Sequence, residues 1–194
     1  MASERSPDAA RLAQAKIKNG LTSGRVELLA GNVDAAEREL HRDYEQLLSL
    51  GELFFRPSLA AMLAQTLFEQ DKLDEAYELT DAAAAIAAED DLECQAILRS
   101  VKAKILVRRG REQEATELAR EALSLLEPTD EVVGRVEVLF DVADVHRVAG
   151  DDGASAEALN AALDLCRRKQ MTVQTKRLEA MLEALDPQSV TQEA

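Results

Sequence analysis

The strongest constraint in this sequence is a unit of about forty residues that recurs along the chain. Three helix-ending segments close on a glycine, at Gly31, Gly110 and Gly150, and a fourth places Asp71 in the same register. Successive turns therefore stand 40, 39 and 40 residues apart. A regular period of this length indicates copies of one supersecondary unit, each of which buries its apolar face against its neighbours.

Small residues recur at fixed distances from each turn. Glycine, alanine or serine stands seven residues before every turn and five residues after it, and the column twelve residues after it holds Asp43 and three alanines. The first two columns are Gly24, Ala64, Ala103 and Ala143, then Ala36, Ala76, Ala115 and Ser155. We expect each unit to be two antiparallel helices in close contact, joined by a tight turn in which glycine takes the left-handed conformation that ends a helix.

Apolar residues between the turns follow helical spacing, as in the stripe from Ala115 to Leu126. The pattern predicts an all-α repeat domain over 7–185, in which the last helix caps the stack. Residues 1–6 and the tail 186–194, which opens on Asp186-Pro187, are predicted to be disordered. The expected helices are 7–30, 33–50, 57–70, 72–88, 91–109, 111–126, 130–149, 153–169 and 172–185.

Charge and composition exclude several classes of function. The chain has 37 acidic and 23 basic residues, a formal charge of -14, and only 3% aromatic residues. Such a charge repels nucleic-acid phosphate and anionic lipid. Neither a membrane-spanning apolar run nor a secretion signal is apparent. We therefore expect a cytoplasmic protein that binds neither nucleic acid nor membrane.

Signatures of catalysis are missing from the sequence. It has no glycine-rich phosphate loop, nucleophile elbow or zinc-binding histidine pair, so no catalytic residue, cofactor or metal is predicted. Cys94 and Cys166 are expected to be buried thiols, His146 a packed core residue and His41 a surface residue. The acidic clusters at 89–91 and 151–152 are expected to cap helices, with Asp90 and Glu93 forming a capping box.

These helix pairs, with their small-residue columns and turn glycines, resemble tetratricopeptide repeats over roughly residues 17–169, most closely between Ala103 and Pro128. The period departs from the family's 34 residues, and Glu27, Leu67, Leu106 and His146 fill its aromatic column. Longer units of this kind resemble the helical-repeat regions of bacterial signalling ATPases, cyclases and transcription activators. The resemblance implies a right-handed α-solenoid of about four antiparallel helix pairs plus a C-terminal capping helix. It also implies a groove, lined by the first helix of each pair, that binds a peptide or another protein.

The phase of each first helix selects the side chains expected to line that groove. Basic residues outnumber acidic ones among them, which favours an acidic partner segment anchored on the two phenylalanines. The predicted set is Arg25, Gln65, Phe68, Lys104, Arg108, Phe140, Asp144 and Arg147. An interpretation of equal weight is that these residues belong to ordinary solvated helix faces.

Two alternatives to partner binding stay open. The chain could be a homodimerisation or spacer module with an unused groove, paired through apolar residues around one connector, Leu50, Leu53, Phe54 and Phe55, which could equally be packed between the first two units. It could also be an enzyme with an unrecognised helical active site.

Overall fold

The computed structural model describes residues 23–185 except Arg25 and Leu29, and within these residues every regular element is an α-helix. They belong to two compact units, one ending at Ala88 and the other beginning at Glu89. The helices are α2 (Val33–Leu50), α3 (Arg56–Glu69), α4 (Leu73–Ala84), α5 (Leu92–Arg108), α6 (Glu112–Leu126), α7 (Val132–Val148), α8 (Asp152–Arg168) and α9 (Thr172–Leu185).

These bounds confirm the predicted all-α fold, and seven of the eight helices end within two residues of their expected positions. The exception is α4, which was expected to reach residue 88 and stops at Ala84. Its alanine-rich continuation has high helix propensity, but propensity is a weak preference that the surrounding structure overrides. The predicted helix 7–30 and the two predicted disordered ends fall largely outside the described residues.

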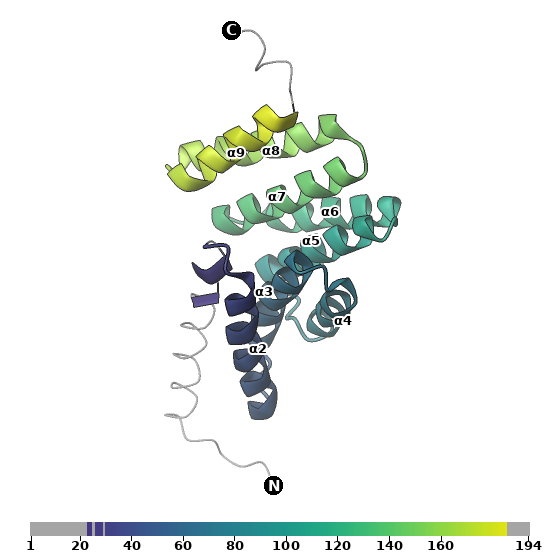
Figure 1. Cartoon of the computed structure of the whole chain (residues 1–194), viewed down its shortest axis with the longest axis vertical. Helices are drawn as coiled ribbons and strands as arrows, with labels where there is room; N and C mark the ends of the chain where they lie inside the picture. The colour runs from purple at the N-terminus through teal and green to yellow at the C-terminus, as the bar shows by residue number, and fades with distance from the viewer. Residues whose placement is uncertain (1–22, 25, 29, 186–194) are drawn as a thin grey trace. The chain divides into compact units, whose positions relative to one another are not determined.

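In the first unit, α3 packs against both α2 and α4 (Figure 1). It therefore buries residues on most of its surface, including Leu59, Leu63 and Leu67. By contrast, α2 buries a single stripe, which contains Ala36, Leu40 and Leu47. One apolar stripe opposite a polar face is typical of a helix with solvent on one side.

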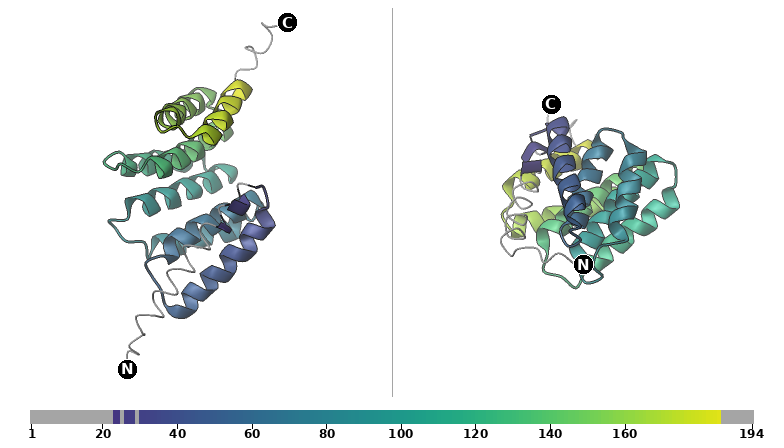
Figure 2. Two further views of the ribbon diagram at one scale, coloured as in Figure 1. Left: turned by 90° about the vertical axis from the view of Figure 1, so that its left-hand side faces the viewer. Right: turned by 90° about the horizontal axis from the view of Figure 1, so that it is seen from below.

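The second unit is a succession of hairpins. The pairs α5–α6 and α7–α8 are antiparallel, α7 also packs on α5 and α6, and α9 packs on α8. Figure 2 shows these helices as successive layers. Ile105, Val138 and Leu159 are fully buried in this core.

All four predicted turn residues adopt the left-handed conformation, with φ of 78° at Gly31, 61° at Asp71, 73° at Gly110 and 82° at Gly150. After each turn the next backbone N–H donates to the carbonyl five residues earlier. The accepting residues are Glu27, Leu67, Leu106 and His146, at 2.8 to 3.0 Å. This bond closes a Schellman motif, so the first helix of each of the four sequence repeats ends in the same way.

The small-residue columns are buried as expected. Ala64, Ala103 and Ala143 are at most 1% exposed. Gly24 is buried too, and a Cβ there would lie 2.6 Å from Leu40 Cδ2. The polar member Ser155 is accommodated because its hydroxyl donates to the Ala143 carbonyl at 2.9 Å.

Two of the acidic residues cap helices. Asp151 Oδ1 accepts from the backbone N–H of Ala154 at 2.9 Å, as predicted. At the start of α5 the cap is Asp91, which accepts from Cys94 N at 3.1 Å, so the expected cap at Asp90 was placed one residue too early. Cys94 itself is buried.

Burial of the other single residues follows the expectations except at His146. Cys166 is buried, which raises the pKa of its thiol. His41 is exposed, as expected. His146, which was expected to be packed in the core, is half-buried.

An ion pair joins α2 to the start of α4 in the first unit. Lys72 Nζ lies 2.5 Å from Glu37 Oε1, and this hydrogen bond is the main cause of a lowered Glu37 pKa and a raised Lys72 pKa. The folded Glu37 carboxyl thus releases its proton more readily than the unfolded one. Its contribution to stability is present above the unfolded pKa and is lost as pH falls through the folded pKa.

We expect Glu37→Gln to reduce the loss of stability between about pH 6 and about pH 3, because glutamine does not titrate. Thermal melts of the variant and the wild type across this range measure the effect. Glu78→Gln, at an exposed position on α4, is the matched control and should follow the wild-type curve. Parallel curves for Glu37→Gln and the wild type would contradict the assignment.

Candidate functional site

The predicted partner-binding residues divide between the two units. Gln65 and Phe68 lie on α3 in the first unit, where Gln65 is half-buried and Phe68 is only 7% exposed. Arg25 lies outside the described residues. The other members all belong to the second unit: Lys104 and Arg108 on α5, and Phe140, Asp144 and Arg147 on α7.

Helix spacing brings the second-unit residues onto two facing stripes. On α5, Ser100, Lys104 and Arg108 follow one another at four-residue intervals, and on α7, Asp141, Asp144 and Arg147 follow at three-residue intervals. Residues three or four apart lie on the same face of a helix. Because α5 and α7 pack directly against each other, side chains of the two stripes meet.

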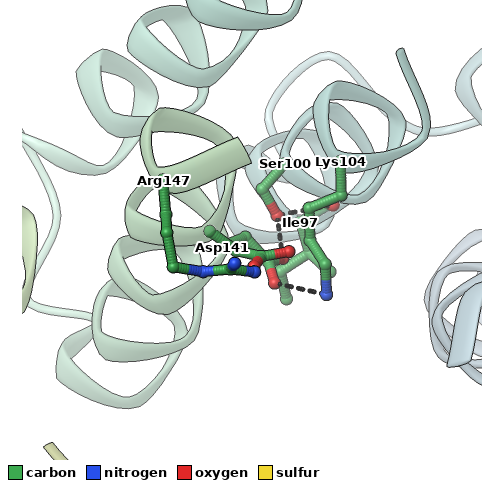
Figure 3. Close-up of polar contacts among 6 residues, drawn as sticks. Ile97, Ser100, Lys104, Asp141 and Arg147 are labelled. Atoms are coloured by element: carbon green, nitrogen blue, oxygen red, sulfur yellow. Dashed lines mark hydrogen bonds and ion pairs between the residues drawn. The ribbon is translucent and has the colours of Figure 1, made fainter. Parts of the chain in front are cut away.

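The centre of this contact is a buried ion pair (Figure 3). Lys104 Nζ lies 3.0 Å from Asp141 Oδ1, and the two side chains are 7% and 10% exposed. The Ser100 hydroxyl donates to Asp141 Oδ2 at 2.7 Å, which is shorter than its 3.0 Å distance to the Ile97 carbonyl. Both carboxylate oxygens are therefore satisfied, as a buried charge requires.

This arrangement corrects the expected exposure of Lys104. Its ammonium group was expected to face a groove and meet an acidic partner, but it is buried and its charge is neutralised within the chain. The helical spacing correctly placed Lys104 on the face of α5 that meets α7, but it did not reveal that the Asp141 carboxylate lies opposite. One signal for the pair was present in the sequence, because Asp141 stands inside the apolar run 138–143 and Lys104 precedes Ile105, Leu106 and Val107.

Next to the pair, more exposed groups lie along α7 and α9. Arg147 forms an ion pair with Asp144, and their side chains are 49% and 23% exposed. The guanidinium carbon of Arg177 on α9 lies 5.0 Å from the centre of the half-buried Phe140 ring, within the range of a cation–π contact. Sequence reasoning missed Arg177 because it treated α9 purely as a cap.

We name the surface formed by these groups the α7–α9 face. It consists of Phe140, Asp144, Arg147 and Arg177. A ring covered by one guanidinium, with a second arginine two turns further along the helix, offers apolar contact and two planar hydrogen-bond donors, a combination suited to a protein segment with carboxylates.

A second exposed feature lies in the first unit, at the connector between α2 and α3. Leu53 is 56% exposed and Phe54 is 71% exposed, whereas Leu50 and Phe55 are half-buried. Of the four apolar residues considered for self-association, two therefore remain available for contact.

Among the described residues, no three histidine, cysteine, aspartate or glutamate side chains are grouped so that they could hold a metal ion. No helix in the same part of the chain has the length and apolar character needed to cross a membrane.

Comparison with known proteins identifies the class of fold. No protein-family model matches this sequence, and no curated protein matches it. The chain is similar to a crystal structure of nearly identical kinesin light chain TPR-like repeats from Podosopora anserina, with 17% identity and a TM-score of 0.57 over 92% of this chain and 97% of that one. A single-residue variant of that protein gives 16% identity and the same TM-score over 89% and 95%.

The chain therefore has a TPR-like helical-repeat fold. Its turns are spaced 39 or 40 residues apart, and the Lys104–Asp141 pair is buried between the first helices of adjacent hairpins.

Proposed function

We propose that this chain is a protein-interaction module that binds a segment of another protein on its α7–α9 face. The observation that carries the proposal is the half-buried Phe140 ring, stacked under Arg177 and followed one and two turns later by Asp144 and Arg147. Aromatic and arginine side chains carry much of the energy of protein interfaces. The proposal assigns no catalytic step to the chain.

An acidic segment is the partner we propose. Arg147 and Arg177 are exposed cations in a protein of charge -14, and a guanidinium can hold a carboxylate through two parallel hydrogen bonds. Lys104 contributes indirectly, because its buried pair with Asp141 fixes α7 against α5. Arg108 is exposed one turn beyond Lys104 and extends the basic character of α5.

The length of the repeat supports a more specific proposal about the assembly to which the module belongs. Units of about forty residues resemble the helical-repeat regions attached to bacterial signalling proteins, so we place the module in a cytoplasmic regulatory assembly of that kind. Homodimerisation or a spacer role is the alternative function, and Leu53 and Phe54 are the exposed apolar residues that it would use. Light scattering over a range of concentrations separates the two, since the partner-binding function expects a constant monomer mass.

Charge reversal tests the α7–α9 face. We expect Arg147→Glu to weaken partner capture about 10- to 30-fold, because it replaces an exposed cation of the α7–α9 face with a carboxylate that repels an acidic partner. The measurement is quantitative affinity capture on the full chain, with mass spectrometry of the retained proteins. Arg120→Glu is the matched control, since Arg120 is an exposed arginine on α6, a helix that contributes no residue to this face.

Both variants should melt close to the wild-type temperature, because the two arginines are exposed. If Arg147→Glu and Arg120→Glu retain the same partners in the same amounts, the site is not on this face.

A further inference from the structure

Three exposed large apolar residues of the first unit stand close together in the sequence. Leu48, Leu53 and Phe54 are 47%, 56% and 71% exposed, and they stand within seven residues of one another at the α2–α3 connector. The other exposed large apolar residues of the described chain are single, at Val26, Val133 and Val173. Isolated exposed residues need no explanation, whereas neighbouring ones offer a candidate contact surface. We name these three residues the connector patch.

The backbone of the connector holds this patch in a fixed conformation. Gly51 ends α2 in the left-handed conformation, with φ of 61°. The two carboxylate oxygens of Glu52 then accept hydrogen bonds from the backbone N–H groups of Phe54 and Phe55, each at 2.9 Å. The Phe54 and Phe55 rings meet edge to face, with centroids 4.9 Å apart and planes at 84°. Preorganisation of this kind reduces the entropy lost on binding.

A cation without a carboxylate partner follows the patch. Arg56, the first residue of α3, is half-buried and forms no ion pair with another described residue. Its Nε atom is buried and meets no hydrogen-bond acceptor among the described residues. Arg56 is half-buried, so part of its side chain is open to solvent, and an incoming carboxylate would complement its charge.

The size of the patch indicates which occupant fits. From their exposed fractions, the three side chains offer roughly 300 Å² of apolar surface. A stable dimer interface needs about 800 Å² from each subunit. Two copies of a chain with charge -14 would also repel each other. A short segment of a different protein matches the area better than a second copy does.

We propose that the connector patch and Arg56 bind a short segment of another protein that carries large apolar side chains next to an aspartate or glutamate. Phe54 is the anchor, Leu48 and Leu53 extend the apolar contact, and Arg56 recognises the carboxylate. This surface lies wholly in the first unit, and the inference is independent of the α7–α9 face.

A displayed library of random 12-residue peptides, selected on the full-length protein, tests the proposal. We expect the enriched peptides to combine two or more large apolar residues with an acidic residue. Phe54→Ser should weaken binding of these peptides about 30-fold, the loss typical of an anchor residue. Val173→Ser is the matched control, because Val173 on α9 is also 71% exposed, and it should leave binding unchanged.

Arg56→Gln separates the two parts of the proposed recognition. A library selected on this variant should still yield apolar peptides through Phe54 and should lose the acidic preference. An acidic preference that persists would overturn the role of Arg56. Melting temperatures of the Phe54 and Arg56 variants confirm that each chain is folded when it is tested.

Three further results would overturn the proposal. The first is an absence of enriched peptides, and the second is peptide binding that survives Phe54→Ser. The third is a concentration-dependent dimer in sedimentation velocity that disappears in Phe54→Ser, which would make a second copy the occupant. Arg147→Glu should leave peptide binding intact; if it abolishes binding, the peptides occupy the α7–α9 face instead.

Discussion

Asp141→Ala is expected to lower the free energy of unfolding of the second unit by about 3–5 kcal/mol. The substitution removes the carboxylate 3.0 Å from Lys104 Nζ and leaves a buried ammonium group without a counter-charge. It also removes the acceptor of the 2.7 Å hydrogen bond from Ser100. Urea unfolding followed by circular dichroism measures the loss.

Two controls show whether this loss comes from the uncompensated charge. Asp144→Ala removes a more exposed carboxylate on the same helix, which pairs with Arg147, and should cost less than about 1 kcal/mol. The double variant Lys104→Met, Asp141→Leu removes both charges and should recover most of the lost stability, since apolar residues of similar volume can replace a buried pair. Asp141→Ala unfolding at the wild-type urea concentration would contradict this description of the pair.

The secondary structure could be predicted from the sequence because its determinants are local. Gly31, Gly110 and Gly150 mark helix ends through the conformation of a single residue, and Asp71 was placed by its register with them. Two left-handed turn residues were not predicted, Gly51 and Gln170. Gln170 lies outside the repeat register and is not a glycine, so no local signal distinguished it.

The arrangement of the α7–α9 face could not be predicted in the same way, because it depends on contacts between helices. The partners Lys104 and Asp141 are 37 residues apart in sequence, and Phe140 and Arg177 are also 37 apart. The spacing of residues along the sequence predicts which of them share one face of a helix. It does not predict which other helix packs against that face. This explains why Lys104 was expected to be exposed although Phe140, Asp144 and Arg147 do lie along one side of α7.

The connector patch shows a different limit. Leu53 and Phe54 were recognised as candidates for contact, but the sequence pattern of an apolar run does not show whether its residues are buried or exposed. Exposure was decided by Glu52, whose side chain accepts the N–H groups of Phe54 and Phe55 and fixes the direction of the chain into α3. Such a side-chain cap over a short connector is specified by three-dimensional geometry and not by apolar periodicity.

Leu178→Ala is expected to release α9 from the second unit. Among the described residues of α9, Leu178 is the fully buried side chain, at 0% exposure. Truncating a buried leucine to alanine costs about 2–5 kcal/mol, because it removes apolar contacts and leaves a cavity. Two further contacts of this helix are the exposed Arg167–Glu179 ion pair and the Arg177–Phe140 contact, and an exposed ion pair adds little stability.

Amide hydrogen exchange distinguishes this local release from general destabilisation. Exchange should accelerate across α9 while protection in α5 and α7 persists, because α9 can open without unfolding the helices beneath it. Leu182→Ala, at a half-buried position on the same helix, should accelerate exchange much less. Uniformly faster exchange from α5 to α9 would show instead that Leu178 stabilises the whole unit. Release of α9 also withdraws Arg177 from Phe140, so Leu178→Ala should weaken partner capture on the α7–α9 face along with Arg147→Glu.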